Sequence, residues 1–247
     1  MSLFLTLLTF GVFVGVSYLS GFMKKGIVPK AVPEGPFIGP LDIGDTQRST
    51  PRTVVVLPTA ADAAVRIEGY ALPQSLYYHQ GHAWVALQES GTAVIGVDDF
   101  AGKLIGKPTS VKLPRVGERC RQGAKGWIFS TKGRMLAMPF PLDGEVVAIN
   151  ERVLNNPEIL TKEPYGNGWL AMVKPRELKR NLRNLLNGAI AMRWMEESAA
   201  ELRSAFSGKL GAVYQDGGLP KEGLAECFDE ADWERFADRV FMVERRG

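Results

Sequence analysis

The chain has few of the residues from which metal and redox centres are built. Its 247 residues include two cysteines, Cys120 and Cys227, and two histidines, His79 and His82. The cysteines are isolated, so no CxxC, haem-attachment or cluster spacing is present, and two scattered thiols fit a reducing compartment. The histidines form an HxxH without a glutamate or cysteine at ligand spacing, which favours a structural role. Metal, haem and iron–sulfur functions are therefore not predicted.

The chain also lacks the residue patterns of an enzyme active site. No Ser-His-Asp order and no phosphate-binding glycine loop is present. The adjacent carboxylates Asp98 and Asp99 are expected to cap a helix over 100–105. A net charge of +3 is too small to indicate nucleic-acid binding. No enzyme activity, small-molecule substrate or nucleic-acid partner is therefore predicted.

Charge is absent from residues 1–23, and this absence defines the first segment. Leu3–Met23 offers 21 mostly apolar residues, enough to cross a hydrocarbon core of about 30 Å at about 1.5 Å per residue. A cleaved signal peptide is the alternative, but a basic start and an Ala-x-Ala site are missing, so an uncleaved transmembrane helix is predicted. Lys24, Lys25 and Lys30 follow the span. The positive-inside rule then predicts an inner (cytoplasmic-type) membrane location, with the N-terminus outside and the main domain in the cytoplasm.

Small residues recur every four positions in this predicted membrane helix. Gly11 and Gly15 form a GxxxG motif, and Ser17 with Gly21 repeats the small-xxx-small spacing. Such spacing lets a second helix approach closely, although glycine is also generally enriched in membrane helices. We predict that these four residues pack against an integral membrane protein subunit.

Prolines concentrate in residues 24–75, which hold seven of the chain's 15. Pro29, Pro33, Pro36 and Pro40 recur every three or four positions, which indicates an extended, polyproline-like path. A strand over 53–57 is the one regular element that the pattern allows there. The predicted parts of the chain are a transmembrane helix (1–23), a proline-rich extended linker (24–76), a β domain (77–175) and a helical C-terminal extension (176–247).

The β domain is expected to centre on a hairpin. Two apolar, β-prone runs, 127–130 and 135–138, flank a short segment in which Gly133 can supply the positive φ of a tight turn. Lys132 therefore sits at the predicted hairpin tip, where it reads as a solvated turn residue. The prolines and the Asp-Gly pair of 139–144 predict a turn before the chain resumes a strand over 145–149.

A lysine at a hairpin tip, followed by such a turn, is typical of lipoyl and biotinyl carrier domains. Six blocks of residues narrow the likeness: 78–85, 93–101, 113–117, 143–150, 156–158 and 164–170. In these blocks, and in their order, the domain resembles the glycine cleavage H protein. This resemblance implies a mainly β cytoplasmic domain, a flattened lipoyl/biotinyl-type β-barrel sandwich, between the N-terminal transmembrane helix and C-terminal α-helices.

The chain departs from the family where the family carries its cofactor. The H protein bears its lipoylated lysine in a motif like Glu-Ser-x-Lys-Ala, whereas this chain reads Phe-Ser-Thr-Lys-Gly-Arg over 129–134. Counted back from Pro141, which matches a proline of the family, the lipoyl position falls on Gly133, one residue after Lys132. Arg134 stands where the family has small or acidic neighbours. The resemblance therefore implies no bound cofactor, and the alternative is a lipoyl group on Lys132.

After Pro175 the apolar residues change to a helical period. They recur every three or four positions and predict one long amphipathic helix or two joined near Asn187-Gly188. The stripe comprises Leu178, Leu182, Leu185, Ala189, Met192, Met195, Ala199, Leu202 and Phe206. Asp229 is expected to cap a last helix over 230–241. That helix should carry Trp233, Phe236, Ala237 and Val240 on one face.

The start of this extension is basic, with six basic residues against one acidic residue over 174–193. A basic amphipathic helix suits an anionic membrane surface, and an interfacial tryptophan suits its boundary. The alternative is a helix that packs on the β domain with a solvated basic face. The residues predicted to contact a membrane surface or a partner are Lys24, Lys25, Lys179, Arg180, Arg183 and Trp194.

Together these features predict a non-catalytic, single-pass membrane-anchored accessory subunit of a larger membrane protein complex. Its partners are expected to be integral membrane protein subunits and membrane lipid. A respiratory or photosynthetic complex is the expected setting, by analogy with the layout of the accessory subunit of photosynthetic reaction centres. A membrane-tethered lipoyl carrier modified at Lys132 is the alternative, and an assembly factor for a membrane complex is the second alternative.

Overall fold

The computed structural model describes residues 64–206 and 220–242. Within those two ranges no helix is long and apolar enough to cross a membrane. The predicted transmembrane helix, with Gly11, Gly15, Ser17 and Gly21, lies outside the described residues, as do Lys24, Lys25 and the possible strand over 53–57. These features therefore stay predictions.

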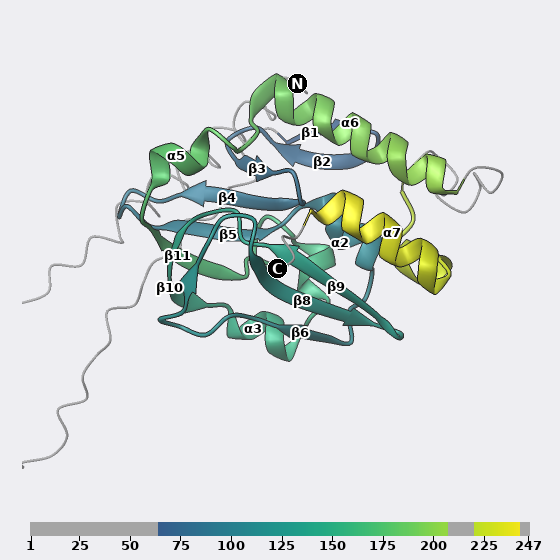
Figure 1. Ribbon diagram of the computed structural model, residues 1–247, viewed down its shortest axis with the longest axis horizontal. Coiled ribbons are helices and arrows are strands. Elements are labelled where there is room, and N and C mark those ends of the chain that lie inside the picture. Colours follow the sequence, from purple (N-terminus) through teal and green to yellow (C-terminus); the bar gives the residue numbers. More distant parts are fainter. Residues whose placement is uncertain (1–63, 207–219, 243–247) are drawn as a thin grey trace, which may run out of the picture. The chain divides into compact units, whose positions relative to one another are not determined.

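The larger sheet has six antiparallel strands in the order β3-β4-β5-β11-β10-β7 (Figure 1). Its strands are β3 (Tyr77–His79), β4 (Ala83–Leu87), β5 (Ala93–Val97), β11 (Ala171–Pro175), β10 (Gly144–Ile149) and β7 (Arg119–Cys120). Every residue of β5 is buried, which its continuous apolar run Ala-Val-Ile-Gly-Val permits. Gly96 is required because a Cβ there would lie 2.5 Å from the ring of Trp84.

The smaller sheet contains the predicted hairpin, in the order β6-β8-β9. Its strands are β6 (Ser110–Lys112), β8 (Lys125–Thr131) and β9 (Arg134–Pro139). The turn residues Lys132 and Gly133 have φ values of 32° and 83°, as a two-residue turn with positive φ at both positions requires. The predicted hairpin and the role of Gly133 are therefore confirmed. Buried side chains of both sheets, including Trp84 and Trp127, belong to one apolar core.

Three short helices make the domain mixed α/β, whereas the sequence predicted a mainly β domain. They are α2 (Asp99–Ile105), α3 (Glu151–Asn155) and α4 (Ile159–Lys162). The side chain of Asp98 accepts a hydrogen bond from the Ala101 N–H at 2.8 Å, so the predicted helix cap is confirmed. Asn150 caps α3 in the same way through the Arg152 N–H. The connections between strands thus hold more helix than their residue patterns indicated.

A hairpin also forms where the sequence predicted only an extended linker. Strands β1 (Ala64–Ile67) and β2 (Tyr70–Pro73) pair through a turn at Glu68 and Gly69, whose φ values are 51° and 85°. Tyr70 and Leu72 are buried in the core. Alternate residues of β2 therefore bury apolar side chains, and Pro73 is tolerated because it ends the strand.

The helical extension begins as two helices, α5 (Leu178–Leu182) and α6 (Gly188–Ala205). The sequence predicted either one long helix or two, and the second form is observed. The break has a structural cause. The N–H of Leu186 donates to the carbonyl of Tyr78 at 2.7 Å, and the N–H of Tyr78 donates back at 2.8 Å. The chain between the helices thus pairs with β3 and cannot continue a helix. Ala189, predicted on the buried stripe, is exposed at the start of α6.

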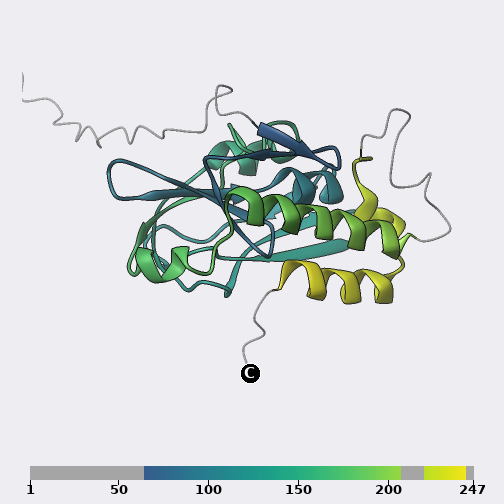
Figure 2. The ribbon, with the colours of Figure 1, turned by 90° about the horizontal axis from the view of Figure 1, so that it is seen from above.

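The last elements are the 3₁₀ helix η2 (Leu224–Cys227) and α7 (Glu230–Phe241). Asp229 caps α7 through the Asp232 N–H at 2.8 Å. Trp233, Phe236 and Val240 are buried and Ala237 is partly buried, so the predicted helix, cap and apolar face are confirmed. Figures 1 and 2 show α7 running alongside the smaller sheet, while α6 runs past β1 and β2.

Candidate functional site: the hairpin tip and its supports

Lys132 projects from the tip of the β8–β9 hairpin and meets a carboxylate from the C-terminal region. Its Nζ lies 2.7 Å from Oε2 of Glu226, and the two side chains are 74% and 27% exposed. The Thr131 hydroxyl donates to the Lys107 carbonyl at 3.2 Å and approaches Glu226 Oε1 at 3.4 Å. Sequence reasoning expected a solvated lysine with no acidic neighbour. The lysine is largely solvated, but its acidic neighbour comes from a residue 94 positions later in the chain.

The segment that supplies Glu226 crosses the hairpin tip, and we call residues 223–228 the strap. At its start, the Gly223 N–H donates to the Lys103 carbonyl at 2.7 Å. At its end, the Arg134 guanidinium donates to the Phe228 carbonyl at 2.5 Å. The strap is thus bound to α2 at one end and to the first residue of β9 at the other.

Aromatic contacts fix the end of the strap. The ring of Phe228 lies 4.6 Å from Phe206, 4.9 Å from Phe236 and 5.7 Å from Trp233, measured between ring centroids. Phe228 is 7% exposed, so this cluster is desolvated. Because apolar burial of an aromatic ring is worth more than an exposed ion pair, we expect Phe228 to hold the strap more firmly than the Lys132–Glu226 pair does.

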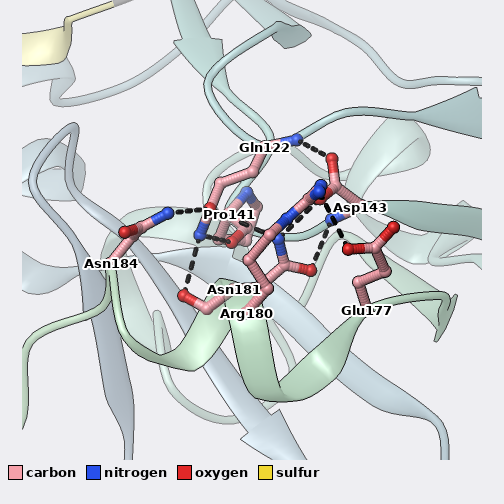
Figure 3. A network of polar contacts seen from close by, with 7 residues as sticks. All are labelled: Gln122, Pro141, Asp143, Glu177, Arg180, Asn181 and Asn184. Atoms are coloured by element: carbon pink, nitrogen blue, oxygen red, sulfur yellow. Dashed lines mark hydrogen bonds and ion pairs between the residues drawn. The ribbon is translucent and has the colours of Figure 1, made fainter.

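The turn that follows β9 has a second, buried support (Figure 3). The carboxylate of Asp143 accepts hydrogen bonds from the Gln122 N–H at 2.9 Å, from the Asn181 amide at 2.7 Å and from the Arg180 guanidinium at 2.7 Å. The Asp143 N–H donates back to Asn181 at 3.0 Å. Asn181 is fully buried, so α5 is bound to the turn through a completed polar network.

This environment changes the acidity of Asp143. Burial by itself would raise the pKa of Asp143, but the hydrogen bonds from its three donors outweigh burial and hold the pKa below its usual range. The ionised carboxylate is therefore the form that the fold stabilises. Arg180, predicted from the sequence as a contact for a membrane or partner, here bridges Asp143 and Glu177, with a side chain that is 60% exposed.

The two histidines lie away from the tip. His82 is fully buried, with Nδ1 2.7 Å from Asp98 and its ring 4.3 Å from Phe100 and 4.5 Å from Trp194. The Gly81 N–H donates to Nδ1 of His79 at 3.0 Å. Among the described residues, no group of three or more histidine, cysteine or acidic side chains gathers to hold a metal ion. These contacts of the two histidines are with neighbouring residues of the β domain and with the start of the helical extension.

The remaining predicted contact residues lie on or near the first helices of the extension. Lys179 and Arg183 are exposed, whereas Trp194 is half-buried against His82. Their contact with a membrane surface or a partner stays a prediction.

Comparison with known proteins matches the part of the chain that contains the hairpin and the turn after it. The family model described as glycine cleavage H-protein matches residues 76–198. The glycine cleavage system H protein 2 of Aquifex aeolicus is 31% identical over 140 residues, covering 56% of this chain and 86% of that protein. This chain belongs to the glycine cleavage H-protein family. Members of this family are lipoyl carrier proteins and not themselves enzymes.

A further relative and a solved structure are also similar to parts of this chain. The glycine cleavage system H protein of Hydrogenovibrio crunogenus is 41% identical over 109 residues, covering 43% of this chain and 83% of that protein. A crystal structure of the H protein from Mycobacterium marinum aligns with 51% of this chain and 98% of that chain, with a TM-score of 0.45 and 24% identity.

The family match extends beyond the predicted domain boundary at Pro175 and includes α5 and part of α6, but it ends before the strap. Glu226 and Phe228 therefore belong to a part of the chain outside the matched region. Sequence reasoning missed Glu226 because a contact across 94 residues leaves no local pattern. The nearest sequence signal to the strap is the helix cap at Asp229. It predicts where α7 begins, but not where α7 packs.

Proposed function

We propose that this chain is a non-catalytic, membrane-anchored accessory subunit that uses its H-protein domain as a docking module rather than as a lipoyl carrier. The observation that carries the proposal is the strap. The hairpin tip, where a carrier of this family would present its cofactor, is engaged by the chain's own residues through Lys132–Glu226 and Arg134–Phe228. A tip bound in this way is suited to a fixed position in an assembly.

The residues at the tip fit a lipoyl group poorly. The position that matches the family's lysine carries Gly133, whose φ of 83° would strain any other residue. The nearest lysine is Lys132, whose amine is ion-paired with Glu226. Attachment of a lipoyl group through an amide would remove the positive charge of this amine and so the ion pair. The flattened barrel-sandwich geometry of the family is accordingly proposed to be kept as a scaffold without its cofactor.

One observation favours the carrier alternative. The Lys132 side chain is 74% exposed, so a modifying enzyme has access to its amine. Intact-mass analysis of the protein purified from its native membranes separates the two functions. We expect the native protein to have its unmodified mass. We expect the variant Lys132→Arg to assemble into the complex as the native protein does. A lipoyl adduct, together with loss of function in Lys132→Arg, would make the protein a membrane-tethered lipoyl carrier.

The proposed setting is an inner (cytoplasmic-type) membrane, with integral membrane protein subunits and lipid as partners. The apolar, uncharged run at 1–23 and the lysines after it support the anchor, and the exposed Lys179 and Arg183 support a contact with an anionic surface. We expect the full chain to stay in the membrane fraction after alkaline carbonate. Release into the supernatant would contradict the anchor.

Co-purification in mild detergent identifies the complex and distinguishes a permanent subunit from an assembly factor. A permanent subunit is expected in the mature respiratory or photosynthetic complex at a fixed ratio. Replacing Gly11 and Gly15 by leucine should weaken this retention without preventing membrane insertion, because leucine fills a close helix contact while keeping the segment apolar. Association with immature complexes alone would favour the assembly-factor alternative.

A further inference from the structure

A groove separates β9 from α7 on the side of the hairpin away from β8. One wall is formed by Gly133–Ala137 and the other by α7, and the groove has a volume of about 510 Å³. The α7 residues that line it are Glu230, Trp233, Glu234, Ala237 and Asp238. Figures 1 and 2 show the helix and the strand side by side along their lengths, so we call this feature the β9–α7 groove.

The strand wall of the groove offers the backbone groups of Ala137 for pairing, while the Met135 carbonyl is occupied by Trp233. Among the described residues, β9 pairs with β8 on one side and with no strand on the other. The register pairs Arg134 with Thr131 and Leu136 with Phe129 across the hairpin. In an antiparallel pair closed by a two-residue turn, the alternate residues Met135 and Ala137 point their N–H and C=O groups away from β8. The Met135 carbonyl confirms this direction, since it accepts a hydrogen bond from Trp233 Nε1 at 3.3 Å.

The helix wall of the groove is acidic. Glu230, Glu234 and Asp238 recur every four residues, are exposed and line the groove together. Among the described residues that line the groove, the one basic side chain is Arg134, and its guanidinium donates to the Phe228 carbonyl. The chain as a whole has a net charge of +3, so this wall is a local exception to its charge.

The spacing of the two walls matches. Four residues of an α-helix rise about 6 Å, and two residues of a strand rise about 6.6 Å. A strand laid along β9 would therefore present every second side chain to successive carboxylates of α7. Met135, which is 71% exposed, gives such a strand an apolar contact beside the charges.

We propose that the β9–α7 groove binds an extended basic segment of a partner protein, with lysine or arginine at alternate positions. Its backbone would pair with Ala137 at the open edge of β9, and its cations would face Glu230 and Glu234. The acidic wall disfavours nucleic acid and anionic lipid. This inference rests on the docking role proposed above, and it names the surface and the chemistry of the docked segment.

The proposal is tested by fluorescence anisotropy on the full chain in mild detergent. The probe is a labelled peptide of alternating lysine and valine, and we expect saturable binding that weakens with salt. Binding should fall about tenfold in Glu230→Lys/Glu234→Lys, since each substitution replaces an attractive exposed ion pair by a repulsive one. The matched control Glu151→Lys/Glu196→Lys makes the same charge change at exposed positions of α3 and α6 and should bind as the wild type does.

Two further probes test the mode of binding. A peptide N-methylated at alternate residues keeps the charges but removes strand hydrogen bonds, and it should bind at least about tenfold more weakly. A glutamate–valine peptide should not bind. The proposal is overturned if the lysine peptide does not bind, if the control variant loses as much affinity as the groove variant, or if N-methylation has no effect. Self-association of the chain through β9 in place of peptide binding would also overturn it. None of these outcomes alters the mass and extraction tests of the proposed function.

Discussion

The Asp143 network and the Lys132–Glu226 pair both join the β domain to the C-terminal region, and they differ mainly in burial. The Asp143 carboxylate is 12% exposed and receives hydrogen bonds from Gln122, Asn181 and Arg180. The Lys132–Glu226 pair consists of one contact between side chains that are 74% and 27% exposed. The first contact binds α5 to the turn after β9, and the second meets the strap at the hairpin tip.

The difference shows which contact holds the fold. A buried carboxylate that loses a partner keeps its desolvation penalty, so removing one donor costs several kcal/mol. An exposed ion pair is screened by water and salt, and it contributes about 0.2 to 1 kcal/mol. Asp143 therefore acts as a structural anchor. At the tip, the aromatic anchor Phe228 rather than the ion pair is expected to hold the strap.

The largest expected effect tests that statement about the tip. Replacing Phe228 by alanine empties the centre of the cluster with Phe206 and Phe236 and should lower the free energy of unfolding by about 4 kcal/mol. Urea unfolding measures the change, and Phe228→Leu should cost less than half as much because it keeps most of the apolar volume. A small effect of Phe228→Ala would mean that the strap contributes little to the fold.

The next largest effect tests the buried anchor. Asn181→Leu removes a donor to the Asp143 carboxylate and the acceptor of its N–H, and it should lower the free energy of unfolding by about 3 kcal/mol. Asn184→Leu is the matched control, because Asn184 is exposed and its amide makes a single hydrogen bond to Gln122. The control should cost less than about 1 kcal/mol. Equal costs would remove the distinction between buried and exposed partners.

Local signals explain the parts of the fold that the sequence predicted. Gly133 predicted the hairpin turn because the turn needs its positive φ. Asp229 predicted the start of α7 because its side chain accepts a hydrogen bond from the first turn of the helix. The β1–β2 hairpin was missed because the neighbouring prolines outweighed the turn signal of Glu68-Gly69. The family resemblance gave the position of the candidate site.

The partners of that site were beyond local reasoning. Glu226 reaches Lys132 across 94 positions, and Asn181 reaches Asp143 across 38. Such contacts depend on how separate elements pack, and a sequence records them only as ordinary polar residues. The break between α5 and α6 was similarly decided by the pairing of Leu186 with Tyr78 on the edge of the sheet.

Acid should weaken the fold through the partly buried His79 and the buried Asp143. Burial and the neighbouring His82 lower the pKa of His79 to about 4, against about 6.5 in an unfolded chain. The unfolded chain therefore binds the additional proton first, and stability falls as the pH drops from about 6.5 to about 4. The depressed pKa of Asp143 adds a loss at lower pH, because its stabilisation is present above the unfolded pKa of about 3.9 and disappears below the folded pKa.

Urea unfolding as a function of pH checks this expectation. His79→Gln should flatten the slope above about pH 4, and Asp143→Asn should flatten the slope below it. Stability that stays constant over the whole range would show that neither group changes its proton affinity on folding. A slope that survives in His79→Gln would assign the effect to other groups.

The smallest expected effect belongs to the exposed contact. A double-mutant cycle of Lys132→Gln and Glu226→Gln should give a coupling free energy below about 1 kcal/mol, because the side chains are largely solvated. The coupling should vanish in about 1 M salt, where the screening length is near 3 Å. A coupling above about 2 kcal/mol that persists in salt would show that the Lys132–Glu226 pair stabilises the fold. The exposed pair and the buried Asp143 network would then both be structural contacts.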